Sequence, residues 1–252
     1  MLLLVTDTSG KDGFVGLVRT DQGTDADRVE VIEEVPLAGG TFSAQLVPQI
    51  SGLLEKHGFC KQDIGAFIVV SGPGSFTGLR VGLAAIKALA EILQKPIVPV
   101  SLLEALAPFS RSVAASHDAP STMMLRYTVV LDASRGEAFV GEYEISSEAG
   151  CSPKALGESL LSLDNLAALL ESGVVQWIST PDQTMFDALR KTVSGSKRRA
   201  VRRNMRRPRS AEVAILGVQK LRAGDCVSPE HLEANYIRRS DADIFPKPSS
   251  CS

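Results

Sequence analysis

The sequence predicts an α/β protein of two lobes, with mixed sheets and helices on their faces, and three observations support this. Its 252 residues are more than one ordinary domain needs, and 44% hydrophobic and 22% charged residues are typical of globular proteins. Short apolar strands alternate with segments of helical periodicity. A strand–turn–strand plan near residue 10 recurs near residue 134, which indicates a loose duplication.

The first half of the chain is expected to form the larger lobe, residues 1–109. It opens with a hairpin whose turn is assigned to Asp12 and Gly13, and Ser43 is expected to cap the first long helix. Strands are predicted at residues 2–5, 14–18, 29–35, 66–70 and 97–100. Helices are predicted after Ser43 up to residue 57, after a glycine-rich turn up to residue 93, and at residues 102–109.

The second half is expected to form a smaller lobe, residues 110–210, that begins with a linker at residues 110–121. Strands are predicted at residues 128–131, 137–143 and 174–179, and helices at residues 165–171 and 185–191. A further amphipathic helix at residues 211–222 is expected to pack back on the first lobe, and residues 223–252 form a tail. The second lobe is thus predicted to be a reduced version of the first.

Composition argues against several classes of protein. The first apolar run stops at Asp7, too short for a signal peptide, and no run is long enough to cross a bilayer, so we expect a cytoplasmic protein without a membrane partner. The four cysteines are far apart and include no C-x-x-C pair, which favours reduced thiols. The three histidines are isolated, so no metal site is expected.

Two segments at strand ends each allow two interpretations. Residues 71–78, Ser-Gly-Pro-Gly-Ser-Phe-Thr-Gly, lie between a strand and a helix, where backbone amides can hold an anion, but they lack the Gly-Lys-Ser/Thr ending of a phosphate loop. A tight turn that packs helix against strand is the favoured alternative. Asp7, Thr8 and Ser9 close the first strand and either hold a magnesium-bound phosphate or form a capped turn.

The helix after the glycine-rich turn carries small residues at three- and four-residue spacings, including Gly78 and Gly82. Glycine inside a helix costs about 1 kcal/mol relative to alanine, and close approach of another helix would compensate for it. From these residues alone, packing within the chain is the first interpretation and contact with a partner the second.

The net charge of −2 conceals a basic run at residues 197–209, which holds eight of the 27 basic residues and no acidic one. Such a cluster can follow RNA phosphates, although a solvated surface explains it equally well. The candidate RNA-contacting residues are Arg198, Arg199, Arg202, Arg203, Arg206 and Arg207.

Residues 72–82, Gly-Pro-Gly-Ser-Phe-Thr-Gly-Leu-Arg-Val-Gly, resemble the signature of the TsaB (YeaZ) family, in the family's strand–loop–helix setting. Support comes from residues 3–9, 99–106, 131–139 and 236–238, and the resemblance is strongest over residues 1–145. The chain departs from the family's pattern at Phe42, where many relatives carry histidine, and at Ala234-Asn235, where they carry proline.

This resemblance implies a two-lobed, actin-like ATPase fold with a reduced second lobe and no catalysis of its own. Family members pair with their paralogue TsaD, which transfers threonylcarbamoyl to the tRNA adenosine next to the anticodon, and the ATPase TsaE joins them. It also implies a homodimer when the chain is alone, contact with tRNA through the complex, and no cofactor besides ATP or ADP at the complex interface. The expected contacts with TsaD are Gly78, Arg80, Gly82, Leu83 and Ile86.

Two other functions remain open. The chain would be an independent nucleotide-dependent enzyme, a kinase or peptidase of the same fold, if it hydrolysed ATP alone. It would be a homodimeric scaffold if the small-residue helix face paired only with its own copy.

Overall fold

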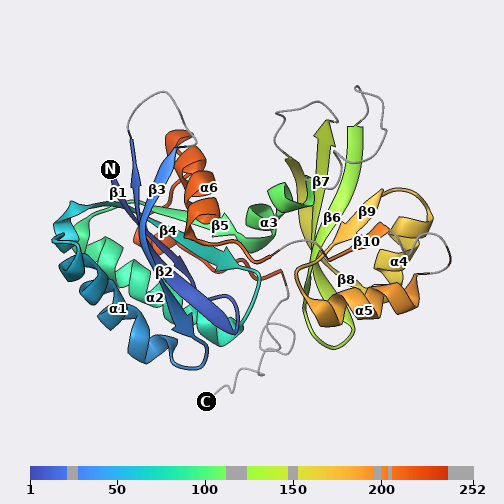
Figure 1. The fold of residues 1–252 in the computed structure, drawn as a ribbon, viewed down its shortest axis with the longest axis horizontal. Helices are drawn as coiled ribbons and strands as arrows, with labels where there is room; N and C mark the ends of the chain where they lie inside the picture. Colours follow the sequence, from blue (N-terminus) through green and yellow to red (C-terminus); the bar gives the residue numbers. More distant parts are fainter. Residues whose placement is uncertain are drawn as a thin grey trace, which may run out of the picture.

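The computed structural model describes residues 1–21, 28–111, 124–146, 153–193, 195, 200–203 and 206–237, which form two α/β lobes side by side (Figure 1). Each lobe contains a five-stranded mixed sheet with helices on its faces, as predicted. None of the helices in these ranges is long and apolar enough to cross a membrane.

The first lobe contains β1 (Leu2–Asp7), β2 (Asp12–Thr20), β3 (Val29–Ala38), β4 (Ile64–Gly72) and β5 (Ile97–Ser101), in the sheet order β3-β2-β1-β4-β5. β1 pairs antiparallel with β2 and parallel with β4. Two helices, α1 (Phe42–Lys56) and α2 (Phe76–Leu93), cover one face of this sheet. Side chains alternate between the faces of a strand, so Leu2 and Leu4 of β1 share a buried cluster with Leu46 of α1 and Ile86 of α2.

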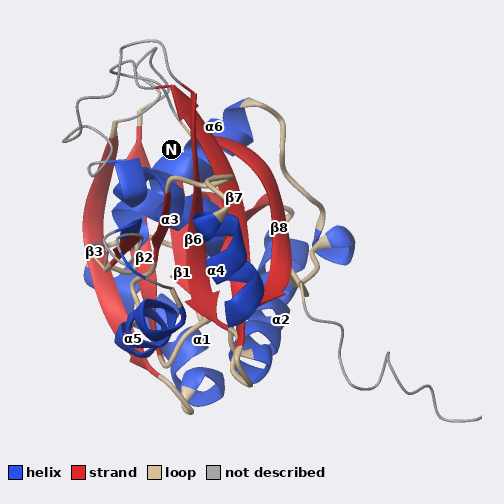
Figure 2. Cartoon of the chain, turned by 90° about the vertical axis from the view of Figure 1, so that its right-hand side faces the viewer, coloured by secondary structure: helices blue, strands red, loops and turns tan. Residues whose placement is uncertain are grey.

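The second lobe repeats this plan. Its strands are β6 (Met124–Asp132), β7 (Glu137–Ser146), β8 (Lys154–Ser162), β9 (Trp177–Ser179) and β10 (Val201–Arg202), in the order β10-β9-β6-β7-β8. β6 is antiparallel to β7 and parallel to β9, as β1 is to β2 and β4. The helices α4 (Leu163–Glu171) and α5 (Gln183–Thr192) lie on the outer face, in front of the sheet in Figure 2. β9 and β10 have only three and two residues, so this lobe is the reduced copy.

Two further helices lie between the sheets and are exchanged between the lobes (Figure 1). α3 (Leu102–Arg111) follows β5 and packs mainly on β6 and β7, with further contacts to β4 and β5. α6 (Ser210–Arg222) follows β10 and packs on the strands of the first sheet. One buried cluster consequently contains Val5 of β1, Leu106 of α3, Val129 of β6 and Val213 of α6. One hydrophobic cluster therefore extends across both lobes.

An aromatic stack lies within this shared core. The Tyr127 ring centroid is 4.8 Å from that of Trp177, the single tryptophan of the chain, and 5.6 Å from that of Tyr143. The Tyr127 hydroxyl donates a hydrogen bond of 3.0 Å to the carbonyl oxygen of Ala107. Because Ala107 belongs to α3, this bond fixes the crossing helix against the second sheet.

Several local predictions are corrected. The strand β8 was not predicted, and Ser110 and Arg111 belong to α3 rather than to a linker, whose remaining residues lie outside the described ranges. Asp12 and Gly13 are the first residues of β2 and do not form the hairpin turn between β1 and β2. A Cβ atom on Gly13 would lie 2.3 Å from the Asp7 carbonyl oxygen, so glycine is needed there for close approach. Ser43 does not cap α1, which starts one residue earlier at Phe42.

We predict that Gly217→Ala destabilises the chain by about 1–3 kcal/mol, because an added Cβ would lie 2.5 Å from the Cδ1 atom of the buried Ile68 and would overpack the contact between α6 and the first sheet. Gly52→Ala is the matched control, since nothing lies within 4 Å of a Cβ atom at that helical position. It should stabilise α1 by about 0.5–1 kcal/mol. Urea unfolding followed by Trp177 fluorescence measures both, and equal effects of the two changes would contradict the prediction.

Candidate functional site

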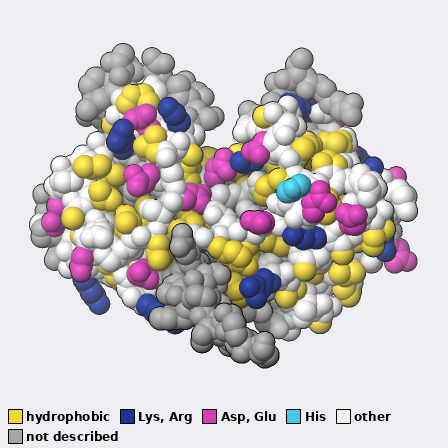
Figure 3. Space-filling model, turned by 180° about the vertical axis from the view of Figure 1, so that it is seen from behind, with side chains coloured by type: hydrophobic (Ala, Val, Ile, Leu, Met, Phe, Trp, Pro, Cys, Tyr) yellow, Lys and Arg dark blue, Asp and Glu magenta, His cyan; other side chains and the backbone are white. Residues whose placement is uncertain are grey.

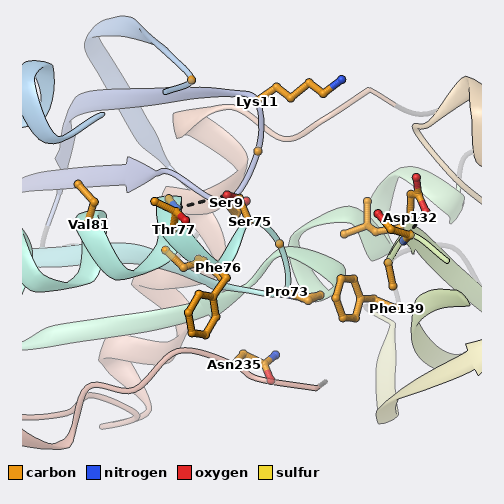
Figure 4. Close-up of a pocket in the computed structure, with 18 of the residues that line it drawn as sticks. Ser9, Lys11, Pro73, Ser75, Phe76, Thr77, Val81, Asp132, Phe139 and Asn235 are labelled. Atoms are coloured by element: carbon orange, nitrogen blue, oxygen red, sulfur yellow. Dashed lines mark hydrogen bonds between the residues drawn. The ribbon is translucent and has the colours of Figure 1, made fainter. Parts of the chain in front are cut away.

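A cleft of about 1110 Å³ lies between the lobes. Its lining comes from the turn after β1, the glycine-rich loop before α2, the turn between β6 and β7, and the C-terminal segment. In Figure 4, Ser9 and Ser75 of the first lobe lie on one side, and Asp132 and Phe139 face them from the second. The cleft therefore lies where β1 and β6, the corresponding strands of the two lobes, both end.

The carboxylate of Asp7, at the end of β1, is buried beneath the turn that follows this strand. Asp7 is only 3% exposed, and its Oδ1 atom accepts hydrogen bonds from the Ser9 amide at 2.8 Å and the Ser9 hydroxyl at 2.6 Å. The turn after β6 has the same construction, since Asp132 Oδ1 accepts from the Ser134 amide at 2.7 Å. Of the two interpretations of residues 7–9, this geometry favours the capped turn.

The glycine-rich loop and α2 are built closely around this turn. The Ser75 amide donates to the Ser9 carbonyl oxygen at 2.7 Å. A Cβ atom on Gly74 would lie 2.2 Å from the Ser9 carbonyl oxygen, and one on Gly78 would lie 2.2 Å from the Thr8 carbonyl oxygen. Packing of α2 against the turn after β1 thus accounts for these glycines, which favours the tight-turn interpretation over a phosphate loop.

The predicted contact surface on α2 needs correction. Gly78, Gly82, Leu83 and Ile86 are buried within the chain, and a Cβ atom on Gly82 would lie 2.1 Å from the Thr8 hydroxyl oxygen. Helical spacing identified residues that share a face, but in the isolated chain that face packs against the first lobe. Only Arg80 of the five is exposed.

Arg80 belongs to a small exposed cluster that the sequence did not predict. Its guanidinium carbon lies 3.7 Å from the ring centroid of Phe76, and its Nε donates to the Tyr236 hydroxyl at 3.3 Å. The rings of Phe76 and Tyr236 are 5.3 Å apart and remain 42% and 45% exposed. Phe76 and Arg80 are four residues apart on α2, and this helical spacing predicts that they are neighbours. Their contact with Tyr236 depends on the fold and cannot be predicted from spacing.

The basic run divides into residues with different surroundings. Arg198 and Arg199 lie outside the described residues. Arg202 is half-buried with its guanidinium carbon 5.2 Å from the Trp177 ring centroid, and burial lowers its pKa. Arg206 forms an ion pair with Glu212, so an acidic residue beyond the run does balance it.

The remaining described members of the basic run are exposed, namely Arg203, Arg207 and Arg209. Arg207 lines the cleft, with Lys11 and Arg135 as further basic residues and Asp132 as an acidic one. In the described part of the chain, no three His, Cys, Asp or Glu side chains are grouped so that they could hold a metal ion.

The duplicated sheets, the exchanged helices and the cleft between corresponding strand ends define an actin-like α/β protein. The family model described as TsaD, tRNA N6-adenosine threonylcarbamoyltransferase, matches residues 36–244. The tRNA threonylcarbamoyladenosine biosynthesis protein TsaB of Bacillus subtilis is 26% identical over 96% of both chains. Its Escherichia coli counterpart is 25% identical over 79% of this chain and 81% of its own. The solved structure of YeaZ from Pseudomonas aeruginosa matches 92% of this chain and 99% of its own with a TM-score of 0.65 and 22% identity.

The chain belongs to the TsaB (YeaZ) family, within the wider family that the TsaD model describes. This confirms the resemblance inferred from residues 72–82 and the actin-like fold that it implied.

We predict that Asp7→Asn becomes increasingly stabilising relative to the unsubstituted chain as the pH rises. Burial raises the pKa of Asp7 above its ordinary value of 3.8, while the hydrogen bonds from Ser9 and the charge of Arg207 oppose this rise. An acid with a higher pKa in the folded than in the unfolded chain binds more protons when folded, so its contribution to stability is lost as the pH rises through the folded pKa.

The measurement is urea unfolding of both proteins between about pH 4 and pH 8. The difference in unfolding free energy should grow from the acidic end and become constant above the folded pKa. A difference that shrinks as the pH rises would mean that the charge of Arg207 and the bonds from Ser9 outweigh burial.

Proposed function

We propose that this chain is a non-catalytic partner subunit in threonylcarbamoyl modification of tRNA, which binds and activates the TsaD transferase acting on the adenosine next to the anticodon. The Bacillus subtilis and Escherichia coli relatives carry tRNA threonylcarbamoyladenosine biosynthesis in their names, and the first matches nearly the whole chain. The match to the TsaD model over residues 36–244 supports a common origin of the chain and the transferase.

The hydrogen bonds within the turn after β1 are the main support for an accessory role. The Asp7 carboxylate is buried and accepts its hydrogen bonds from Ser9, and Ser9 in turn accepts from the amide of Ser75. The polar groups that a catalytic actin-like protein would direct into the cleft thus bond to one another here. This supports activation of a partner rather than chemistry at this site.

We further propose that TsaD contacts the exposed side of α2. Ala84 and Ala88 are exposed there, Ile92 is 78% exposed, and Val47 of the neighbouring α1 is 45% exposed. In Figure 3, apolar side chains gather on the lower part of the first lobe, where these helices lie. A paralogue with the same fold can present the corresponding helices, giving a pseudo-symmetric interface.

Three further assignments complete the proposal. TsaE joins the complex, the chain forms a homodimer through the same side of α2 when TsaD is absent, and ATP or ADP binds at the interface with TsaD. These follow from the family, and none of them requires the chain to hold a cofactor alone.

We predict that Ala88→Arg weakens the complex with TsaD at least about 100-fold, since it places a bulky charge in the centre of an apolar interface. Ala168→Arg, on the exposed side of α4 in the second lobe, is the matched control and should bind like the unsubstituted chain. Light-scattering chromatography and titration calorimetry with purified TsaD measure both. Normal binding by Ala88→Arg would place the interface elsewhere, and no complex with the unsubstituted chain, together with ATP hydrolysis by the chain alone, would favour the independent enzyme.

Contact with tRNA is proposed for Arg203 and Arg207, and for Arg198 and Arg199. We predict that replacing Arg203 and Arg207 together by serine weakens tRNA binding by the complex and reduces the slope of log affinity against log salt by about two. Arg190→Ser, an exposed change on α5, is the control. Gel shifts at several salt concentrations measure this, and an unchanged slope would show that Arg203 and Arg207 do not contact the RNA.

A further inference from the structure

The C-terminal segment 232–237 connects to both lobes along the cleft. Leu232 is buried in the core of the first lobe, and Asn235, Tyr236 and Ile237 line the cleft. The Asn235 amide donates a hydrogen bond of 2.8 Å to the carbonyl oxygen of Ser71, in β4. This segment therefore lies along the end of the first sheet, beside the glycine-rich loop.

On its first-lobe side, the segment is held by α2. The Tyr236 hydroxyl accepts from Arg80, and the Tyr236 ring lies beside that of Phe76. All three side chains are exposed at their outer surface, so a binding partner can reach them. Stacked aromatic and arginine side chains of this kind are the residues that most often dominate protein interfaces.

On its other side, the segment is held by the second lobe through Glu158 of β8. Glu158 Oε2 accepts a hydrogen bond of 2.6 Å from the Asn235 side-chain amide, and Oε1 accepts one from the Ser101 hydroxyl at the end of β5. Hydrogen bonds to a carboxylate are stronger than those between neutral groups. One carboxylate of the second lobe thus connects to two segments of the first.

We propose that Glu158 and residues 232–237 form a clasp that holds the two lobes at a fixed opening of the cleft, and that TsaD releases it by contacting Tyr236 and Arg80. The clasp is a property of the chain alone, whereas its release rests on the proposed function. Asn235 and Tyr236 are neighbours in the chain, so displacing the tyrosine from Arg80 moves the amide that bonds to Glu158. The shared core of α3 and α6 then becomes the remaining connection about which the lobes can open.

Hydrogen exchange of the full chain tests the clasp. In Glu158→Ala and in Asn235→Ala, the backbone amides of residues 232–237 should exchange about tenfold faster. The double variant should exchange no faster than Glu158→Ala alone, because Glu158→Ala already removes the hydrogen bond that Asn235→Ala removes. Glu142→Ala on the adjacent strand β7 is the matched control.

Fluorescence emission of the buried Trp177 shows whether each variant retains its native core. Glu158→Gln keeps the shape of the side chain and is a milder change than Glu158→Ala. Exchange within twofold of the unsubstituted chain in both alanine variants would overturn the clasp.

Titration with TsaD tests the release. If binding requires an open clasp, Glu158→Ala should bind TsaD about tenfold more tightly, because the clasp no longer has to be broken. Glu142→Ala should bind as before. Unchanged or weaker binding by Glu158→Ala would overturn the release while leaving the proposed function intact. No binding by any variant would refute the proposed function and the release with it, and the exchange experiment would still decide the clasp.

Discussion

Two helices that cross between the lobes, α3 and α6, hold this fold together. A mixed sheet with apolar residues on both faces needs a cover on each, and each sheet here receives one cover from its own lobe and the other from a crossing helix. The lobes are joined by a continuous core and not by a linker alone. This core fixes the ends of β1 and β6 opposite each other, and the cleft is a consequence of that placement.

Close backbone approach determines the character of the cleft. Glycines at positions 74, 78 and 82 allow the loop before α2 to pack on the turn after β1, and any side chain at those positions would meet Thr8 or Ser9. In open α/β sheets this place, outside the carboxyl ends of the strands, is where ligands usually bind. Here the chain's own hydroxyl, amide and carboxylate groups meet there, so the architecture of the fold is kept while its polar groups bond internally.

The sequence predicted those features that depend on local patterns. The sequence predicts α2 from its helical apolar periodicity and β4 from its continuous apolar run. In β8, by contrast, apolar and polar residues do not alternate over Lys154–Ser162, and this strand is ordered by pairing with β7. Periodicity also showed that Gly82 and Ile86 share a helix face, but not that Thr8 and the first-lobe core cover it. Arg206 illustrates the same limit, because its partner Glu212 lies outside the basic run and becomes its neighbour only through the start of α6.

The crossing helices also affect how the chain is made on the ribosome. α6 completes the first sheet, yet it occupies Ser210–Arg222 and is synthesised after every strand of both lobes. The nascent first lobe therefore carries an uncovered apolar sheet face until α6 has been synthesised. The usual order, in which an N-terminal lobe folds before the rest of the chain is made, does not apply here. The first sheet is completed only after α6 has left the ribosome, which makes the growing chain a natural client for chaperones that shield apolar surfaces.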